Sequence, residues 1–399
     1  MALTRGFRLA RIAGIDIDID WSLMIIFTLI TMILATGVFP VWHPDWPAAL
    51  SWGTAVAAAI LFFASVLIHE MSHALVGRAN GIDVRHITLF VFGGMAHMEN
   101  EPPSWQSELA MTIVGPITSL VLGMIFLWIG GVIAGPIAVD PDNPGAVFAQ
   151  LSPAATLCFW LGPVNIILGL FNLVPGFPLD GGRVLRAVIW AVTGNLYLAT
   201  RWASRSGQAF AWLLMATGFA MILGIQVPIF GGGLINGLWL AFIGWFLNTA
   251  AVMGYHQLTL RNALEGVPVT RLMQTRLTRL QPDITVARVI EEHVMESGQR
   301  TFPVEEGGRL TGMISLSDLQ KIPVAERTHI RVHEVMTPME RLITVTPSTD
   351  SMEALSVLGK WDLNQLPVVE NGRFIGLVRR EDILKWLSLY FPAGEKLPV

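Results

Sequence analysis

Three residues that could perform hydrolytic chemistry stand within five positions of one another: His69, Glu70 and His73, in the stretch LFFASVLIHEMSHALV. On a helix, residues four positions apart lie on the same face, so two histidines at this spacing can bind one metal ion with the glutamate beside it. Such a site suits zinc, with the glutamate as the general base that activates water. The surrounding stretch is apolar, and ionisable residues in such a stretch usually mark a functional site.

A third metal ligand is expected from FNLVPGFPLDGGRVL, residues 171–185. Pro175 and Pro178 interrupt a helix, because proline lacks the backbone donor and clashes with the preceding turn. Interrupted backbone at membrane depth is tolerated only where it is buried in protein or lines a cavity. Asp180 follows this interruption directly, and two glycines after it allow close backbone approach. The Asp180 carboxylate would complete a site with the two histidines.

Six apolar stretches are long enough to cross about 30 Å of hydrocarbon and would position these residues. The chain is 53% hydrophobic and 14% charged, with a mean hydropathy of +0.56. Residues 1–255 hold 21 of the 56 charged side chains, so the first part favours lipid and the rest favours water. The expected spans are residues 21–39, 51–76, 109–134, 154–174, 210–227 and 232–253.

The connecting loops predict the orientation in the membrane, because cytosolic loops are enriched in Lys and Arg. The loops near residues 40–50, 135–153 and 228–231 contain neither residue type. We therefore expect both termini in the cytosol of a multi-pass protein of the cell membrane, with the metal in the cytosolic third of the bilayer. The arginines that support this orientation are Arg5, Arg8, Arg11, Arg78, Arg85, Arg183, Arg186, Arg201 and Arg205.

The two motifs, HEMSH and NLVPGFPLDG, make the chain resemble the site-2 protease group of intramembrane metalloproteases, peptidase family M50. The resemblance covers about residues 10–255 and matches HExxH and NxxPxxxxDG without departure. It implies that His69, His73 and Asp180 bind Zn²⁺ and that Glu70 is the catalytic base. It also implies that Asn172, the first residue of the second motif, helps to bind the substrate carbonyl or oxyanion.

The segment VRHITLFVFGGMAHM, residues 84–98, is too short to span a membrane and has the composition of a β-hairpin. We interpret it as a re-entrant hairpin whose edge could pair with an extended substrate, with an ordinary surface hairpin as the alternative. His86 and His97 in this segment are expected to be interfacial polar residues rather than ligands. The alternation in GIDIDIDW predicts a solvated strand before the first span.

Residues 262–390 contain an internal repeat of about 64 residues, in which GMISLSDL at 312–319 matches GLVRREDI at 376–383. Each copy is expected to contain a strand, a helix, two strands and a helix. The pair resembles a tandem CBS domain, a module that commonly binds adenine nucleotides. The resemblance implies Ser315, Asp318 and Asp382 as nucleotide-binding residues. Arg379 stands where the second copy should have a small hydroxyl residue.

The expected fold class is an α-helical polytopic membrane protein, with six transmembrane helices and a small re-entrant β-hairpin, plus a soluble α/β tandem CBS domain. The expected boundaries are 1–255 for the metalloprotease domain, 256–261 for a linker, 262–325 and 326–390 for the CBS repeats and 391–399 for a tail. A structural or dimerising CBS pair is the alternative to a nucleotide-binding one. The CBS pair could also form a homodimer.

These features predict an intramembrane zinc metalloprotease that cuts membrane-anchored proteins near the cytosolic face. We expect the CBS pair to regulate substrate entry near Arg261 through a bound ligand. The alternative is a CBS-regulated transporter or channel, for which NxxPxxxxDG has no use at its spacing. A catalytically silent zinc-binding scaffold is a second alternative. The net charge of −4 gives no reason to expect nucleic acid as a partner.

Overall fold

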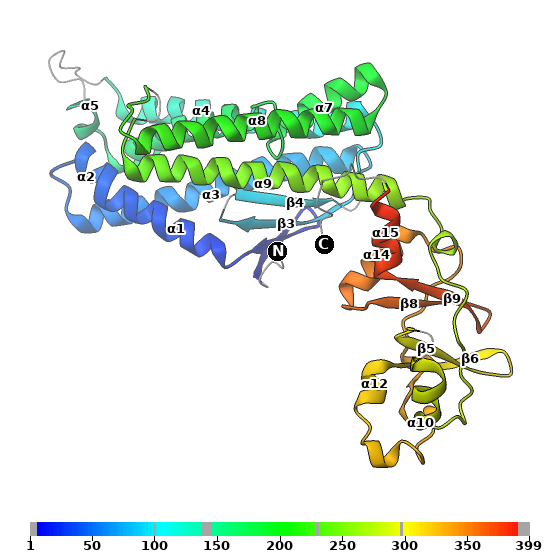
Figure 1. The fold of residues 1–399 in the computed structure, drawn as a ribbon. Coiled ribbons are helices and arrows are strands. Elements are labelled where there is room, and N and C mark those ends of the chain that lie inside the picture. The colour runs from blue at the N-terminus through cyan, green and yellow to red at the C-terminus, as the bar shows by residue number, and fades with distance from the viewer. Residues whose placement is uncertain are drawn as a thin grey trace. The chain divides into compact units, whose positions relative to one another are not determined.

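The computed structural model describes residues 6–91, 93–98, 101–136, 146–228, 231–295 and 298–389. The chain divides into two compact units, residues 1–255 and 256–399 (Figure 1). Phe92 in the expected hairpin and the expected tail at 391–399 lie outside the described residues.

The first unit is a bundle of helices with one small sheet. In Figure 1 its long helices run alongside one another, and β3 and β4 lie beside them. The helices are α1 (Ser22–Ile33), α2 (Phe39–Trp42), α3 (Ala48–Ala79), α4 (Trp105–Ala134), α5 (Ala146–Ala149), α6 (Pro153–Asn172), α7 (Asp180–Thr193), α8 (Leu196–Ile222) and α9 (Leu234–Leu264), whose residues from 256 onward belong to the second unit. A five-residue π-helix, Leu34–Val38, joins α1 to α2.

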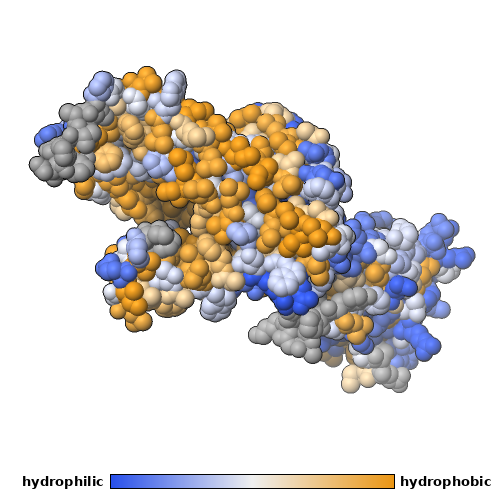
Figure 2. Space-filling view, turned by 90° about the horizontal axis from the view of Figure 1, so that it is seen from above, coloured by the Kyte–Doolittle hydropathy of each residue, from blue (hydrophilic) through white to orange (hydrophobic). Residues whose placement is uncertain are grey.

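Five helical stretches in the described part are long and apolar enough to cross a membrane: Ser22–Trp42, Ala48–Ala79, Trp105–Ala134, Pro153–Asn172 and Leu234–Leu264. The sixth expected span, at 210–227, corresponds to α8, which is also a helix but is not one of the five. Its first half carries Arg201 and Arg205, which shorten its apolar part. Figure 2 shows hydrophobic residues across the visible face of the helical unit, as lipid contact requires.

The small sheet contains the two strands of the expected hairpin and two further strands from the N-terminal segment. Its strands are β1 (Phe7–Ile12), β2 (Ile15–Ile19), β3 (Val84–Phe90) and β4 (Gly93–Met98), in the order β1-β2-β3-β4. Strands β3 and β4 pair antiparallel, as predicted, and β2 is the strand predicted before the first span. The parallel pairing of β2 with β3 was not predicted, because it joins segments about 70 residues apart in the sequence.

The helix ends near the site have local causes. Helix α3 ends at Ala79, and Gly81 then adopts a φ of +81°, a conformation that glycine takes at little cost. Helix α6 begins with Ser152 as its N-cap, whose side chain accepts a hydrogen bond from the backbone N–H of Ala155, and with Pro153 in its first turn. It ends at Asn172, just before the two prolines of the interrupted segment.

The second unit contains two similar repeats, which pair through their edges. Repeat 1 contains α10 (Val286–Val289), a π-helix (Ile290–Val294), β5 (Thr301–Glu306), β6 (Arg309–Ser315) and α12 (Leu316–Gln320). Repeat 2 contains α14 (Ser351–Lys360), β8 (Gln365–Glu370), β9 (Arg373–Arg379) and α15 (Arg380–Leu387). Between them lie α13 (Val332–Val335) and β7 (Thr337–Pro338).

The leading strand expected in each repeat is reduced to one isolated bridge, Leu280 to Val304 in repeat 1 and Val345 to Val368 in repeat 2. The residues just before these bridges pair with the other repeat instead: Gln274 bridges to Leu377, and β7 pairs with β6. The leading strand of each copy is therefore shorter than predicted. The segment just before it pairs with a strand of the other copy.

Candidate metal centre

The structure brings the side chains of His69, His73 and Asp180 together, although 107 residues separate His73 from Asp180. The Nε2 atoms of both histidines lie 3.2 Å from Asp180 Oδ2 and 3.2 Å from each other. Three atoms at this spacing fit three corners of a tetrahedron whose centre lies about 2.0 Å from each, which is the length of zinc–nitrogen and zinc–oxygen bonds. A zinc ion held by these three atoms would have one further position for water or substrate.

The Nδ1 atoms of the two histidines, which point away from the other ligand atoms, are held by contacts that orient the imidazole rings. His73 Nδ1 lies 2.7 Å from the backbone oxygen of Met111, and a carbonyl oxygen only accepts, so Nδ1 carries the proton. In the neutral ring, Nε2 then presents a lone pair to the other two ligand atoms. His69 Nδ1 lies 2.8 Å from Ser119 Oγ. Lone pairs that converge in this way repel unless a cation lies between them, so the donor set fits a metal ion.

Asp180 is the first residue of α7, where the positive end of the helix dipole favours a carboxylate. The helix end therefore favours the ionised form of Asp180, which is the form that binds zinc.

The interrupted segment before Asp180 is held by close backbone contacts. A side chain on Gly181 would clash with the carbonyl oxygens of Leu173 and Val174, and one on Gly182 would clash with the backbone of Gly176 and Phe177. Both glycines are needed because α7 begins directly against the loop that precedes it.

Helix α8 also holds this loop, since Phe177 donates its backbone N–H to the oxygen of Ala203 at 3.1 Å. The hydroxyl of Ser206 donates to the oxygen of Pro175. The start of α7, and with it Asp180, is thus fixed by α8 as well as by the loop itself.

Helix α4 is the part of the site that sequence reasoning missed. It supplies the Met111 carbonyl and the Ser119 hydroxyl, and between them Gly115 lies directly against both imidazoles. A Cβ atom on Gly115 would lie 2.8 Å from His69 Nε2 and closer still to His73 Nε2. These three residues are four positions apart and share one face of α4. Gly115 and Ser119, a small and a polar residue four positions apart in an apolar span, were the signal available in the sequence. Met111 contributes only its backbone oxygen.

Glu70 points toward the hairpin. A Cβ atom on Gly94 of β4 would lie 2.9 Å from the Glu70 carboxyl carbon, so the side chain of Glu70 packs directly on the β4 backbone. Among the described strands, β4 is at the edge of the sheet, with β3 on its other side. The predicted base therefore lies between the predicted metal ligands and an edge strand.

The remaining residues considered in the first unit lie as follows. Asn172 is the last residue of α6 and is half-buried. His86 Nδ1 lies 3.4 Å from Asp18 Oδ2 on the sheet, away from the metal ligands, and the side chain of His97 is outside the described part. Asp16 pairs with Arg8, so the alternating carboxylates of β2 have separate partners. In the described residues, His69, His73 and Asp180 form the one cluster with metal-ligand geometry.

The predicted nucleotide-binding residues differ between the two repeats. In repeat 1, Ser315 is the N-cap of α12, and its hydroxyl donates to Asp318 Oδ2 at 2.6 Å. Burial raises the pKa of Asp318, but hydrogen bonds from Ser315 and Lys321 outweigh it and lower the pKa. In repeat 2, the Arg379 guanidinium holds both oxygens of Asp382 at 2.8 Å. The carboxylate of Asp382 is therefore engaged by a fixed cation.

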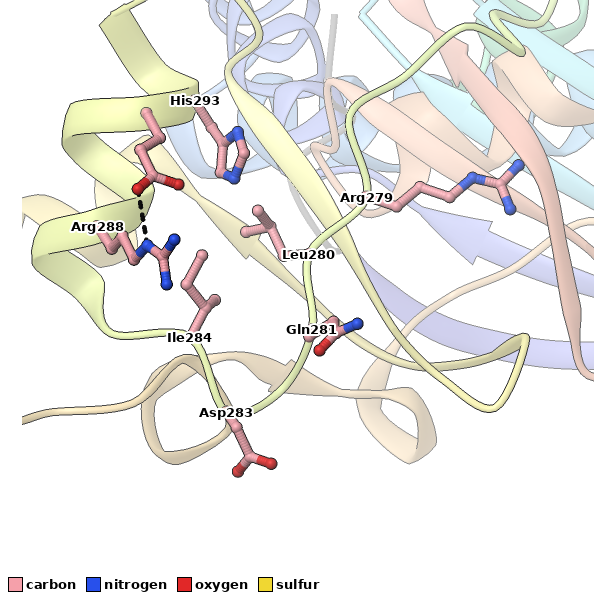
Figure 3. A pocket seen from close by; sticks show the side chains of 8 residues that line it. Arg279, Leu280, Gln281, Asp283, Ile284, Arg288 and His293 are labelled. Carbon is pink, nitrogen blue, oxygen red and sulfur yellow. Dashed lines mark hydrogen bonds and ion pairs between the residues drawn. The ribbon is translucent and has the colours of Figure 1, made fainter.

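A cavity of about 340 Å³ in repeat 1 does not involve these residues (Figure 3). Its charged groups are already paired: Arg288 bonds to Glu292 at 2.7 Å, and Arg279 bonds to Glu305. In Figure 3 the Arg279 side chain points away from the other labelled residues. We assign no ligand to this cavity.

Comparison with known proteins gives consistent matches. Peptidase family M50 matches residues 57–215, and the CBS domain family matches residues 269–324 and 332–389. The chain is 31% identical over 386 residues to Rip3 of Mycobacterium tuberculosis, whose name assigns it provisionally to the zinc metalloproteases. That alignment covers 96% of this chain and 93% of Rip3.

Two archaeal proteins are also similar. Zinc metalloprotease MJ0392 of Methanocaldococcus jannaschii is 26% identical over 83% of this chain and 84% of its own length. Among solved structures, the site-2 protease from Methanocaldococcus jannaschii is 24% identical and covers 63% of this chain and 95% of that chain, with a TM-score of 0.42.

Proposed function

This chain belongs to peptidase family M50, and we propose that it is an intramembrane metalloprotease. His69, His73 and Asp180 would bind the catalytic zinc, and Glu70 would be the general base. The observation that carries the assignment is the equal spacing of 3.2 Å among the three ligand atoms. The Met111 carbonyl supports it, because it holds His73 with Nε2 toward the other ligands.

Peptide hydrolysis needs a nucleophile and a proton carrier. Bound zinc would lower the pKa of water to about 7 and polarise the scissile carbonyl. Glu70 would take a proton from water while the water oxygen bonds to the carbonyl carbon. It would then give that proton to the peptide nitrogen as the C–N bond breaks. Asn172 would donate a hydrogen bond from its amide to the carbonyl oxygen, a role supported by the motif NLVPGFPLDG, which begins at Asn172 and ends at Gly181.

The substrate would be a membrane-anchored protein that presents an extended segment. A helix hides its peptide bonds, whereas an extended segment can add to a free strand edge and gain main-chain hydrogen bonds. Strand β4 offers such an edge within the described sheet, and its Gly94 packs against Glu70. A segment paired with β4 would therefore run beside the general base.

The enzyme would lie in the cell membrane with both termini and the metal site toward the cytosol, an orientation that requires α8 to cross the membrane as a sixth span beside the five apolar helices. The support is the distribution of arginine, which is concentrated in alternate loops and absent from the others. On this proposal residues 1–255 form the protease domain, 256–261 the linker, 262–325 and 326–390 the CBS repeats and 391–399 the tail.

The CBS pair would regulate the protease by binding an adenine nucleotide in repeat 1. Ser315 and Asp318 are the supporting residues, because their hydroxyl and carboxylate could accept hydrogen bonds from a ribose. A ribose in repeat 2 would have to displace Arg379 from Asp382, so we propose that repeat 2 is closed to it. Association of two chains through their CBS pairs is compatible with this assignment.

A transporter or channel is not favoured, because relatives that match nearly the whole chain are named as metalloproteases. A catalytically silent zinc-binding scaffold would bind zinc as a protease does. It would differ in that the wild-type protein cleaves no substrate.

The Glu70→Gln variant tests the mechanism on the full chain in detergent. It should keep about one zinc per chain while cleavage of a membrane-anchored substrate falls by about 10²- to 10⁴-fold, the usual worth of a general base. The exposed Glu265→Gln serves as the matched control. Undiminished cleavage by Glu70→Gln would contradict the assignment, and zinc binding without cleavage in the wild type would favour the scaffold.

A further inference from the structure

A buried ion pair joins α7 to α4. The side chain of Arg186 on α7 is 6% exposed and that of Glu108 on α4 is 0% exposed. Arg186 donates from Nε to Glu108 Oε1 at 2.6 Å and also contacts this oxygen through NH2. In the described part of the chain, Glu108 Oε2 has no hydrogen-bond partner. The sequence motifs assign no role to either residue.

The same guanidinium group reaches two more segments. Its NH2 lies 3.3 Å from Glu101 Oε2, in the segment between β4 and α4. Its Cζ lies 5.5 Å from the centre of the Phe177 ring, in the loop just before Asp180, at a distance typical of a cation–π contact. Arg186 therefore contacts α4, the segment after the hairpin, and the loop that delivers a predicted zinc ligand.

The ion pair lies close to the metal ligands along both helices. Asp180 precedes Arg186 by six residues, or about 9 Å of helix. Glu108 precedes Met111 by about one turn, and the same helix then presents Gly115 and Ser119 to the imidazoles. The pair thus connects the helix that carries the carboxylate ligand with the helix that orients both histidines.

Stability alone is a poor reason for such a pair, because apolar residues of similar size are often as stabilising as a buried ion pair. Arg186 instead contacts one oxygen of Glu108 through a fork of two nitrogens, Nε and NH2, and the rigid planar guanidinium group then fixes direction as well as distance. We propose that Arg186 is a positioning residue: through Glu108, it sets α7 against α4 so that Asp180 meets His69 and His73 at zinc-binding distance. The inference rests on the proposed function, because it concerns the same metal site.

The Arg186→Lys variant separates positioning from charge, since lysine keeps the charge and loses the fork. Zinc affinity is measured in detergent by competition with a chelator, alongside the melting temperature of the zinc-free protein. Partners that contact metal ligands directly contribute about 10- to 100-fold in affinity, and because the contacts of Arg186 lie one step farther out, we expect a loss of about 10-fold. The exposed Arg201→Lys on α8 is the control and should bind zinc as the wild type does.

The double variant Glu108→Met with Arg186→Met replaces both charged side chains by apolar ones of similar size and provides the second test. We expect a melting temperature near that of the wild type with zinc still bound about 10-fold more weakly. Zinc affinity within twofold of wild type in Arg186→Lys would overturn the inference, whatever the double variant does. If the wild type itself binds no zinc, the proposed function fails; if it binds zinc and Arg186→Lys binds equally well, only the role of Arg186 fails.

Discussion

Replacing Gly115 by alanine adds one methyl group at the point where α4 meets the two imidazoles. The new Cβ atom would lie 2.8 Å from His69 Nε2, whereas ordinary contacts begin at 3.4 Å, and it would lie closer still to His73 Nε2. The rings would have to move by at least about 0.6 Å, three times the roughly 0.2 Å tolerance of a metal–ligand bond.

The Gly115→Ala variant should therefore fold but fail to hold zinc. Alanine in place of glycine favours a helix by about 0.5 to 1 kcal/mol, which offsets part of the crowding. We expect zinc affinity to fall by at least about 100-fold, as judged from the distortion of two ligands at once, and cleavage to fall with it.

The same helix provides a control with the same chemical change. Gly131 of α4 has nothing within 4 Å of an added Cβ atom. Gly131→Ala should keep the zinc content and cleavage rate of the wild type. The assays are zinc per chain after dialysis, melting temperature with and without zinc, and cleavage of a membrane-anchored substrate. If Gly115→Ala keeps one zinc per chain and the wild-type rate, the proposed placement of the metal beside α4 is wrong.

Three further predictions follow from contacts around the two proposed sites. Gly94→Ala should lower kcat by about 10²-fold without loss of zinc, because its Cβ would displace the Glu70 carboxylate; a wild-type rate would contradict this contact. Ser119→Ala should weaken zinc binding by about 10-fold or more, measured by chelator competition, and equal affinity would remove its orienting role. Arg379→Ser should raise AMP binding from about one to about two per chain in calorimetry, by releasing Asp382; one AMP per chain in this variant would show that Arg379 is not what closes repeat 2.

The local parts of the site could be predicted from the sequence because they depend on short-range geometry. The i, i+4 spacing of His69 and His73 places both rings on one face of any helix, whatever surrounds it. Two prolines three residues apart, at 175 and 178, strongly disfavour a continuous helix, and the structure accordingly ends α6 at Asn172 and starts α7 at Asp180. The antiparallel hairpin at 84–98 follows in the same way from β-branched and glycine residues near one turn.

The CBS repeats show where local prediction stops. Internal similarity predicted two copies of one fold, and the helices and later strands of each copy are present. It did not predict that the leading strand of each copy shrinks to a single bridge, with the preceding segment paired to the other repeat through Gln274 and β7. That choice depends on how the two copies share an edge, which neither copy specifies alone.

The sequence alone predicted the residue types of the proposed metal site, the helix that carries two of them and the broken segment that carries the third. Only the tertiary structure decided that α4 holds the imidazoles through Met111 and Ser119, that Gly115 makes room for them, and that Arg186 joins α7 to α4. The physical reason is that spacing along a helix sets which residues share a face, whereas the partner of that face depends on packing between segments far apart in the chain.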